Sequence, residues 1–429
     1  MSNQNLMARL LEGVAVKWKA MGDISDIYGG LTGKSKADFE NGNASYISYM
    51  NIFNNIEVNF EKLESVKLSD SENQHEVKYG DVLFTGSSET AEEAGMSSAV
   101  TTELEGSVYL NSFSFGVRFY EDIKLIPEFS KYLFRSHFMR SGIAKTASGV
   151  TRFNISKARF KKILIPIPPL EIQSEIVRIL DTFTELTAEL TAELTARKKQ
   201  YTYYRNQLLT FEDGQVEWKA LGEVGEYSTT RISSDLLDKT NYVGVDNLLQ
   251  NRAGKTDSNY VPTEGNLTGY CQNDILIGNI RPYLKKIWHA DRVGGTNGDV
   301  LVIHPTDETI NPRYLYQVLA DDMFFDYNMQ HAKGAKMPRG NKAKIMEYPI
   351  PIPFPTDPEK SLTEQARIVA ILDKFDALTN SITEGLPREI EQRQKQYEYY
   401  REMLLNFPKA EVTQWPTIKP LQKQTTSLF

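Results

Sequence analysis

The sequence predicts an α+β protein in which two pseudo-symmetric α/β domains are separated by two long antiparallel coiled-coil helices. Three observations support this prediction. Residues 14–211 are followed by a diverged second copy of themselves, each copy mixes strand-like with helix-like segments, and each copy ends in a long apolar stripe of helical period. Because the order of the segments is kept, we expect one fold to occur twice.

The duplication shows in segments that return in the same order. VKWKAMGDI from Val16 returns as VEWKALGEV from Val216, and QYTYYRNQLLTF from Gln200 returns as QYEYYREMLLNF from Gln396. The offset between the copies drifts from 200 through 193 and 185 to 196, which indicates loops of changed length in a kept frame. A partner with two equivalent half-sites, such as duplex DNA, would match this symmetry. Duplication that merely stabilised a fold is the alternative.

Within each copy, short apolar runs predict strands, and proline-rich runs at Ile165–Glu171 and Ile350–Pro358 are expected to end the domain. Proline cannot continue a strand ladder or sit inside a helix. The predicted strands lie at 46–53, 82–84, 242–245, 275–277 and 300–303.

After the first proline run, apolar residues alternate at spacings of four and three from Ile172 to Phe211. This stripe predicts a helix of about 40 residues and about 60 Å. The stripe of the second copy is interrupted at Gly385-Leu386-Pro387, where we expect a break. Tyr203, Tyr204, Tyr399 and Tyr400 are candidates for docking other subunits, or they complete the seam between the helices.

The first helix contains a tandem tetrapeptide. Thr187-Ala188-Glu189-Leu190 is followed by Thr191-Ala192-Glu193-Leu194. Alanine, glutamate and leucine are strong helix formers, so each unit adds about 6 Å of helix. We expect the repeat to act as a spacer; low-complexity helical filler is the alternative.

Composition excludes several classes of protein. No stretch approaches the roughly 18 apolar residues of a membrane span, and the N-terminal residues lack a signal peptide's apolar block, so a cytoplasmic protein is expected. The single Cys271 excludes an internal disulfide and a thiolate zinc site. We find no methyltransferase, nucleotide-binding, hydrolase or metalloprotease motif, and GGLTGKS at Gly29 lacks the glycine spacing of a phosphate-binding loop.

The net charge of −7 argues against indiscriminate binding to polyanions. Two segments at matching positions differ from the rest of the chain, because Lys145–Lys162 and His331–Lys344 are basic and contain no acidic residue. Gly149 in the first corresponds to Gly334 in the second. They predict paired contacts with DNA phosphates, although a solvated face would have the same composition.

Together the TAEL repeat, the segments ARKKQYTYYRNQLL and EIEQRQKQYEYYREMLL, and GGLTGKSKADF from Gly29 resemble the DNA-specificity (S) subunit of type I restriction–modification systems. The resemblance is closest to the subfamily with TAEL repeats in the central helix. It divides the chain into target-recognition domain 1 (1–168), a central conserved helical region (169–211), target-recognition domain 2 (212–355), a C-terminal conserved helical region (356–408) and a tail (409–429).

The resemblance implies a non-catalytic subunit that recognises a bipartite target in double-stranded DNA, two short half-sites separated by a fixed spacer. Two modification subunits and two restriction subunits would dock on it. Those partners would bring S-adenosylmethionine, ATP and Mg²⁺, and the chain itself would bind no cofactor or metal. A scaffold with two equivalent sites for a protein partner is the rival hypothesis.

Sequence-specific binding needs cations on phosphates and hydrogen-bonding groups at base edges. The candidates in the first domain are Lys34, Lys36, Arg118, Lys145, Thr151, Arg152, Asn154 and Lys157. Those in the second are Arg231, Arg281, Lys285, Lys286, Lys333, Lys336, Arg339, Asn341 and Lys342.

Overall fold

The structure is a computed structural model that describes Leu10, Val14 and residues 16–69, 71–212, 214–381 and 384–407. The predicted tail, 409–429, lies outside the described residues. The chain forms two compact units: unit 1 is Met1–Glu185 with Lys395–Phe429, and unit 2 is Leu186–Gln394. The boundaries between these units fall inside the long helices. The domain boundaries predicted from the sequence follow whole helices instead, and they stay a prediction.

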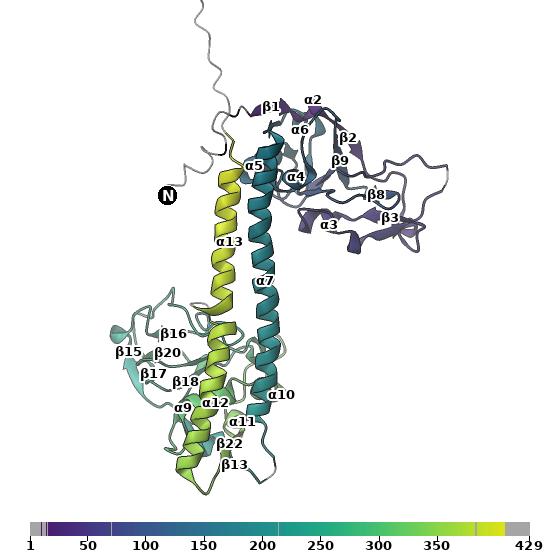
Figure 1. Ribbon diagram of the computed structural model, residues 1–429. Helices are drawn as coiled ribbons and strands as arrows, with labels where there is room; N and C mark the ends of the chain where they lie inside the picture. The colour runs from purple at the N-terminus through teal and green to yellow at the C-terminus, as the bar shows by residue number, and fades with distance from the viewer. Residues whose placement is uncertain are drawn as a thin grey trace, which may run out of the picture. The chain divides into compact units, whose positions relative to one another are not determined.

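Unit 1 contains a four-stranded antiparallel sheet in the order β2-β9-β5-β7. Figure 1 labels two of its strands, β2 and β9. Its central strand β5 is buried along its whole length, as expected for a continuous apolar run. The strands of this sheet are β2 (Ser25–Gly29), β5 (Val82–Thr85), β7 (Ser97–Ala99) and β9 (Ser114–Phe119). Two three-stranded sheets complete the unit: β4 (Glu64–Val66), β3 (Ala44–Ile47) and β8 (Val108–Leu110), and β10 (Ala147–Ser148), β11 (Phe153–Ile155) and β6 (Ser87–Ser88).

Unit 2 repeats the central sheet in the order β14-β21-β18-β19. These strands are β14 (Gly225–Tyr227), β18 (Ile275–Gly278), β19 (Ile287–His289) and β21 (Val300–Pro305). A second four-stranded sheet consists of β15 (Arg231–Ser233), β17 (Asn266–Tyr270), β20 (Gly294–Thr296) and β16 (Tyr242–Val243). The mixed α/β fold and its repetition are therefore confirmed.

Short helices cover the sheets. Those of unit 1 are α2 (Met21–Ile24), α3 (Tyr49–Asn54), α4 (Pro127–Leu133), α5 (His137–Ala144), α6 (Lys157–Phe160) and the 3-10 helices η1 (Lys36–Phe39) and η2 (Phe60–Lys62). Those of unit 2 are α8 (Leu221–Val224), α9 (Pro312–Leu319), α10 (Asp322–Gln330), α11 (Lys342–Met346), η3 (Ser234–Leu236) and η4 (Pro282–Leu284). The strand predicted at 46–53 is wrong beyond Ile47, because Tyr49–Asn54 forms a helix that buries Ile52.

The first part of each proline run is a strand, which corrects the expectation that proline cannot continue a ladder there. β12 (Leu164–Ile167) pairs with β1 (Lys17–Ala20), and β22 (Pro349–Pro353) pairs with β13 (Val216–Ala220), both antiparallel. Each is one strand of a two-stranded sheet. The prolines of β22 recur at every second residue, so they share one side of the strand, and the missing N–H groups fall where no partner strand lies.

The predicted first helix is confirmed as α7 (Leu170–Leu209), 40 residues without interruption (Figure 1). The second helical stretch is broken, as predicted, into α12 (Pro358–Thr379) and α13 (Gly385–Leu404). The break precedes Gly385, whose φ of +74° allows α13 to begin there, and Pro387 lies in the first turn, where its missing N–H costs nothing. No helix of the described residues is long and apolar enough to cross a membrane.

Candidate nucleic-acid interface

The basic segment of the first copy forms a hairpin. β10 and β11 pair antiparallel, with Ser148 opposite Asn154, and the turn between them carries Gly149. Gly149 has a φ of +154°, and a Cβ at this position would lie 1.9 Å from the carbonyl oxygen of Arg152. Only glycine fits this turn. We call residues 147–155 hairpin 1.

The basic segment of the second copy has the same design. Lys333 and Arg339 exchange two backbone hydrogen bonds, of 2.9 and 2.8 Å, around a turn in which Gly334 has a φ of +98°. We call residues 333–339 hairpin 2. Each hairpin then pairs with a corresponding segment of its own unit: Asn154 with Ser87, and Arg339 with Ile280. The two basic segments therefore occupy equivalent places.

A capped helix follows each hairpin. The Ser156 hydroxyl accepts from the backbone N–H of Arg159 at the start of α6, and the Asn341 amide oxygen accepts from those of Ala343 and Lys344 at the start of α11. The candidate Asn341 is thus a helix cap. Lys157 and Lys342, the first residues of the two helices, are exposed.

Among the other candidates of the hairpins, Lys145, Thr151, Arg152, Asn154, Lys333, Lys336 and Arg339 are all exposed. Arg152 is held loosely: its Nε donates to the Ser87 hydroxyl at 3.2 Å, and its guanidinium lies 5.7 Å from the centre of the exposed Phe113 ring. Arg339 forms an ion pair of 3.2 Å with Asp299, and its side chain is still 55% exposed.

A cavity of about 440 Å³ lies beside hairpin 1. Thr151 and Arg152 line it from the hairpin, and Tyr49 and Met50 line it from α3. Glu89, which follows β6, lines it as well. Sequence reasoning missed Tyr49, Met50 and Glu89, because it counted cations and neither an apolar nor an acidic side chain adds to that signal.

Two candidates of the first domain form ion pairs with carboxylates. Arg118 donates from Nε and Nη2 to the two carboxylate oxygens of buried Asp81, at 2.8 and 2.7 Å. These hydrogen bonds raise the pKa of Arg118. The Lys34 side chain is 4% exposed, and its Nζ lies 2.5 Å from a carboxylate oxygen of Glu72. The hydrogen bond from Lys34 lowers the pKa of the Glu72 carboxyl to about 2.

In the second domain, Lys286 donates to the carbonyl oxygen of Val245 at 2.5 Å, and burial lowers its pKa. Lys285 pairs with Asp322 at 2.8 Å. Arg231 is exposed on β15 and donates to the Thr268 hydroxyl at 3.2 Å. Arg281 is also exposed, as is Lys36 of the first domain.

The paired tyrosines divide into two kinds. Tyr204 stacks on Phe375 with ring centres 5.6 Å apart in unit 2, and Tyr400 stacks on Phe183 at 5.1 Å in unit 1. These two rings therefore contribute to helix packing. Tyr203 and Tyr399 are 57% and 47% exposed.

The tandem repeat lies on a regular part of α7. The hydroxyl of Thr191 donates to the carbonyl oxygen of Thr187 at 2.7 Å, and that of Thr195 donates to Thr191 at 2.9 Å. Each threonine hydroxyl thus donates to the carbonyl oxygen four residues earlier. Four residues are slightly more than one helical turn, so successive repeat units are rotated slightly about the helix axis.

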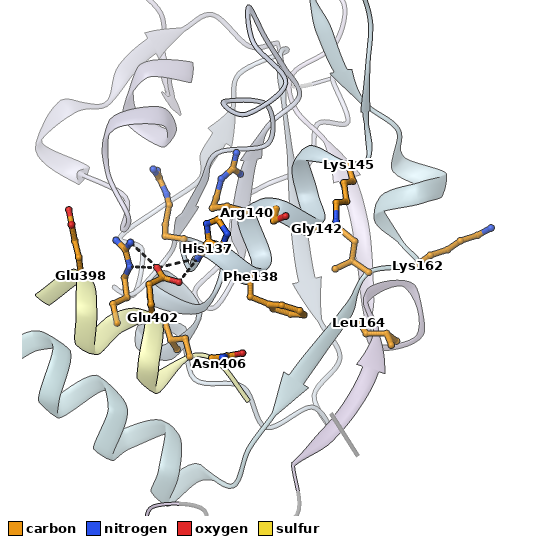
Figure 2. Close-up of a pocket in the computed structure, with 15 residues that line it drawn as sticks. His137, Phe138, Arg140, Gly142, Lys145, Lys162, Leu164, Glu398, Glu402 and Asn406 are labelled. Carbon is orange, nitrogen blue, oxygen red and sulfur yellow. Dashed lines mark hydrogen bonds and ion pairs between the residues drawn. The ribbon is translucent and has the colours of Figure 1, made fainter. Parts of the chain in front are cut away.

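A cavity of about 1070 Å³ lies in unit 1 between α5 and the end of α13 (Figure 2). The Glu402 carboxylate accepts from the backbone N–H of His137 at the start of α5. Arg135 and Arg140 point their guanidinium groups at backbone carbonyls, and burial lowers the pKa of each to about 10. These donors are occupied, and Arg401, which also lines the cavity, pairs with Glu402. The exposed Lys145 and Lys162 lie at the cavity edge.

No group of three or more histidine, cysteine, aspartate or glutamate side chains in the described part of the chain is placed to hold a metal ion.

Comparisons with known proteins agree with this organisation. The family model for the type I restriction modification DNA specificity domain matches twice, over residues 15–197 and 215–392. The chain is 30% identical over 428 residues to a putative type I restriction enzyme specificity subunit of Haemophilus influenzae, covering 95% of this chain and 99% of the relative. It is 42% identical over 274 residues to the type I restriction enzyme EcoR124I/EcoR124II specificity subunit of Escherichia coli, covering 60% of this chain and 66% of that relative.

Two solved structures share the fold. The crystal structure of a type I restriction–modification S subunit from M. genitalium matches with a TM-score of 0.52 at 15% identity, covering 93% of this chain and 97% of that chain. A chain from a study of complex assembly and conformational transition of the type I R-M system matches with a TM-score of 0.54 at 16% identity, covering 91% and 97%. The double match of the family model and the full-length relative show that the chain belongs to the type I restriction–modification DNA specificity family, whose members are non-catalytic specificity subunits.

Proposed function

We propose that this chain recognises a bipartite DNA target, with hairpin 1 and its surroundings reading one half-site and hairpin 2 and its surroundings reading the other. The observation that supports this most is the repetition of an exposed basic hairpin on the same scaffold in both copies. All the candidate residues named from the sequence belong to this proposal. Exposed Thr151, Arg152, Lys333 and Lys336 are its strongest members, and Lys34, Arg118 and Lys286 are its weakest, because their charges already have partners.

The assembly is part of the proposal. Two modification subunits would dock on the helical regions, with Tyr203 and Tyr399 as exposed contacts, and two restriction subunits would complete the complex in the cytoplasm. S-adenosylmethionine, ATP and Mg²⁺ would be bound by those partners. The uninterrupted TAEL tract of α7 supports membership of the TAEL-repeat subfamily, in which helix length would set the spacer between half-sites.

Methylome sequencing tests the proposal. A cell that receives this chain with a cognate modification subunit should acquire one new bipartite methyl-adenine motif, and exchanging residues 1–168 for another domain of the class should change one half-site only. A matched cell with the modification subunit alone is the control. No new motif with an active partner would refute the proposal, and a change in both half-sites would refute its modular form.

A further inference from the structure

The segments that pair with the hairpins end in side chains of opposite charge. Asn154 of hairpin 1 pairs with Ser87, and Glu89 follows two residues later. Arg339 of hairpin 2 pairs with Ile280, and Arg281 is the next residue. Glu89 and Arg281 therefore lie within one residue of corresponding positions. Each follows the segment that pairs with the basic hairpin of its unit.

Glu89 is an acceptor beside the exposed cation of hairpin 1, Arg152, in a cavity that Glu93 also lines. It is exposed and lines the 440 Å³ cavity with Thr151 and Arg152. Within the described part of the chain its carboxylate has no hydrogen-bond or ion-pair partner, whereas nearby Glu93 accepts from Ser88 and from Thr90 at 3.3 and 3.0 Å. A carboxylate repels phosphate, so on a surface that meets DNA its complement must be a hydrogen-bond donor of a base.

The chemistry of the major groove selects cytosine as that base. Cytosine presents its N4 amino group without an adjacent acceptor, whereas the N6 amino group of adenine lies beside N7, whose lone pair would repel a carboxylate. Guanine and thymine present acceptors there. Exposed Met50 on the same cavity wall gives the base an apolar neighbour.

Arg281 is a donor held in a demanding backbone conformation. Its φ of +53° lies in the left-handed region, and its backbone N–H donates to the carbonyl oxygen of Pro338 in hairpin 2 at 2.7 Å. Non-glycine residues keep this conformation only where their surroundings fix it, and such positions gather at functional sites. Among the described residues the Arg281 guanidinium has no partner, whereas Lys285 pairs with Asp322 and Arg339 with Asp299.

We propose, on the basis of the DNA-binding function above, that the two recognition domains read their half-sites with hydrogen bonds of opposite direction at these corresponding positions. Glu89 accepts from the N4 amino group of a cytosine in the half-site of the first domain. Arg281 donates its two-pronged guanidinium to O6 and N7 of a guanine in the half-site of the second.

The test uses the full chain with its modification subunits and compares Glu89→Gln with Glu92→Gln. Glu92 is exposed in the same loop but does not line the cavity, so it controls for the loss of one negative charge. Glu89→Gln should reduce discrimination for cytosine at one position of the first half-site by roughly tenfold or more, in the methylome and in binding to duplexes with single substitutions. The second half-site should be unchanged.

For the second domain, Arg281→Gln is compared with Arg292→Gln, because Arg292 is an exposed arginine of the same domain whose charge is paired with neighbouring Asp291. Arg281→Gln should relax one guanine of the second half-site. Uniformly weaker binding with an unchanged preference would instead identify a phosphate contact and overturn this half of the inference.

Failure of this inference is distinct from failure of the proposed function. If the unaltered chain yields no bipartite motif, the proposed function fails. If it yields one and Glu89→Gln leaves the first half-site intact, or Glu92→Gln alters it equally, only the role of Glu89 is overturned.

Discussion

A buried aspartate precedes the central strand in both copies, and the same position has acquired two different partners. Asp81 accepts from the backbone N–H of Lys78 and pairs with Arg118, whereas Asp274 accepts from that of Cys271 and pairs with His304 at 2.6 Å. The carboxylate closes the turn in both copies. Its partner on the neighbouring strand of the sheet differs between them.

Gly149 gives a prediction about hairpin 1. Gly149→Ala would place a methyl group 1.9 Å from the Arg152 carbonyl oxygen, so the turn must rearrange and the exposed Thr151 and Arg152 must move. We expect binding to duplexes containing the first half-site to weaken by about tenfold, an estimate that corresponds to the loss of one base or phosphate contact. Gly106→Ala is the control, since Gly106 also has a positive φ, of +134°, but open space around its Cβ position. Equal binding by the two variants would contradict the prediction.

His289 gives a prediction about pH. Burial, aided by the charge of Arg313, lowers its pKa to about 4, and its Nε2 has no hydrogen-bond partner among the described residues. In the unfolded chain a histidine binds its proton near pH 6.5. Protonation therefore favours unfolding between pH 6.5 and 4, and the stability of unit 2 should fall as the pH falls through this window.

The measurement is urea unfolding of the unaltered chain and of His289→Gln at several pH values. The variant should lose less stability than the unaltered chain between pH 6.5 and 4, while above pH 7 neither should show a dependence from this residue. Parallel pH curves would show that His289 does not titrate in this way.

At the scale of elements, the long helix was predictable and the proline-rich strands were not. The stripe of α7 repeats over 40 residues, so many side chains report the same period. By contrast, the strand character of Pro349–Pro353 depends on pairing with Val216–Ala220, more than a hundred residues away in the sequence. Proline is disfavoured in a central strand, which pairs on both edges, but Pro349–Pro353 pairs on one edge only.

The equivalent arginines of the two helical regions give a matched pair of variants. Arg205 is 4% exposed, and its guanidinium donates to Asp321, Tyr201 and Gln317. Its counterpart Arg401 pairs with the neighbouring Glu402 at the cavity edge. Arg205→Ala removes a buried guanidinium and leaves the partly buried Asp321 carboxylate without its ion-pair partner, so it should destabilise unit 2 by about 3–5 kcal/mol. Arg401→Ala should cost unit 1 about 1 kcal/mol or less.

Chemical denaturation that monitors each unit separately measures this difference. Similar losses for the two variants would show that burial does not distinguish the two arginines.

The tandem repeat gives a prediction about length. Deleting Thr191–Leu194 removes about 6 Å of helix, which is slightly more than one turn. The parts of the helix on either side of the deletion are therefore rotated by about 40° relative to each other. We expect a shorter spacer with both half-sites unchanged. Replacing the same four residues by alanine keeps the length of the helix, so this control should keep the spacer. Methylome sequencing of both variants decides, and an unchanged spacer after the deletion would refute the role in spacing.

At the scale of the molecule, the sequence predicted the duplicated α/β fold, and the basic segments did occupy equivalent places as hairpins. It could not show which cations remain free. Arg118 and Lys34 were chosen for their charge, and the acids that neutralise them, Asp81 and Glu72, lie 37 and 38 residues away along the chain. Only folding brings each pair together.

Unit 1 has a discontinuous core, which gives the last prediction. Leu404, Leu405 and Phe407 are buried with Ile176 and Leu180. A chain ending at Gln394 lacks the first three, so unit 1 should lose protection from hydrogen exchange, whereas unit 2 should keep it. Leu404→Ala, which retains the chain, should weaken unit 1 by about 2–5 kcal/mol. Retained protection of unit 1 in the shortened chain would contradict the prediction.

The same discontinuity bears on how the chain is made. Proteins emerge from the ribosome with the N-terminal residues first, and domains usually fold in that order. Here the residues of unit 2 are contiguous and complete once Gln394 has emerged, whereas the core of unit 1 lacks Leu404, Leu405 and Phe407 until later. The half that is translated first is therefore finished last. During that interval Ile176 and Leu180 have no cover from α13, and a nascent-chain chaperone has its main opportunity to bind there.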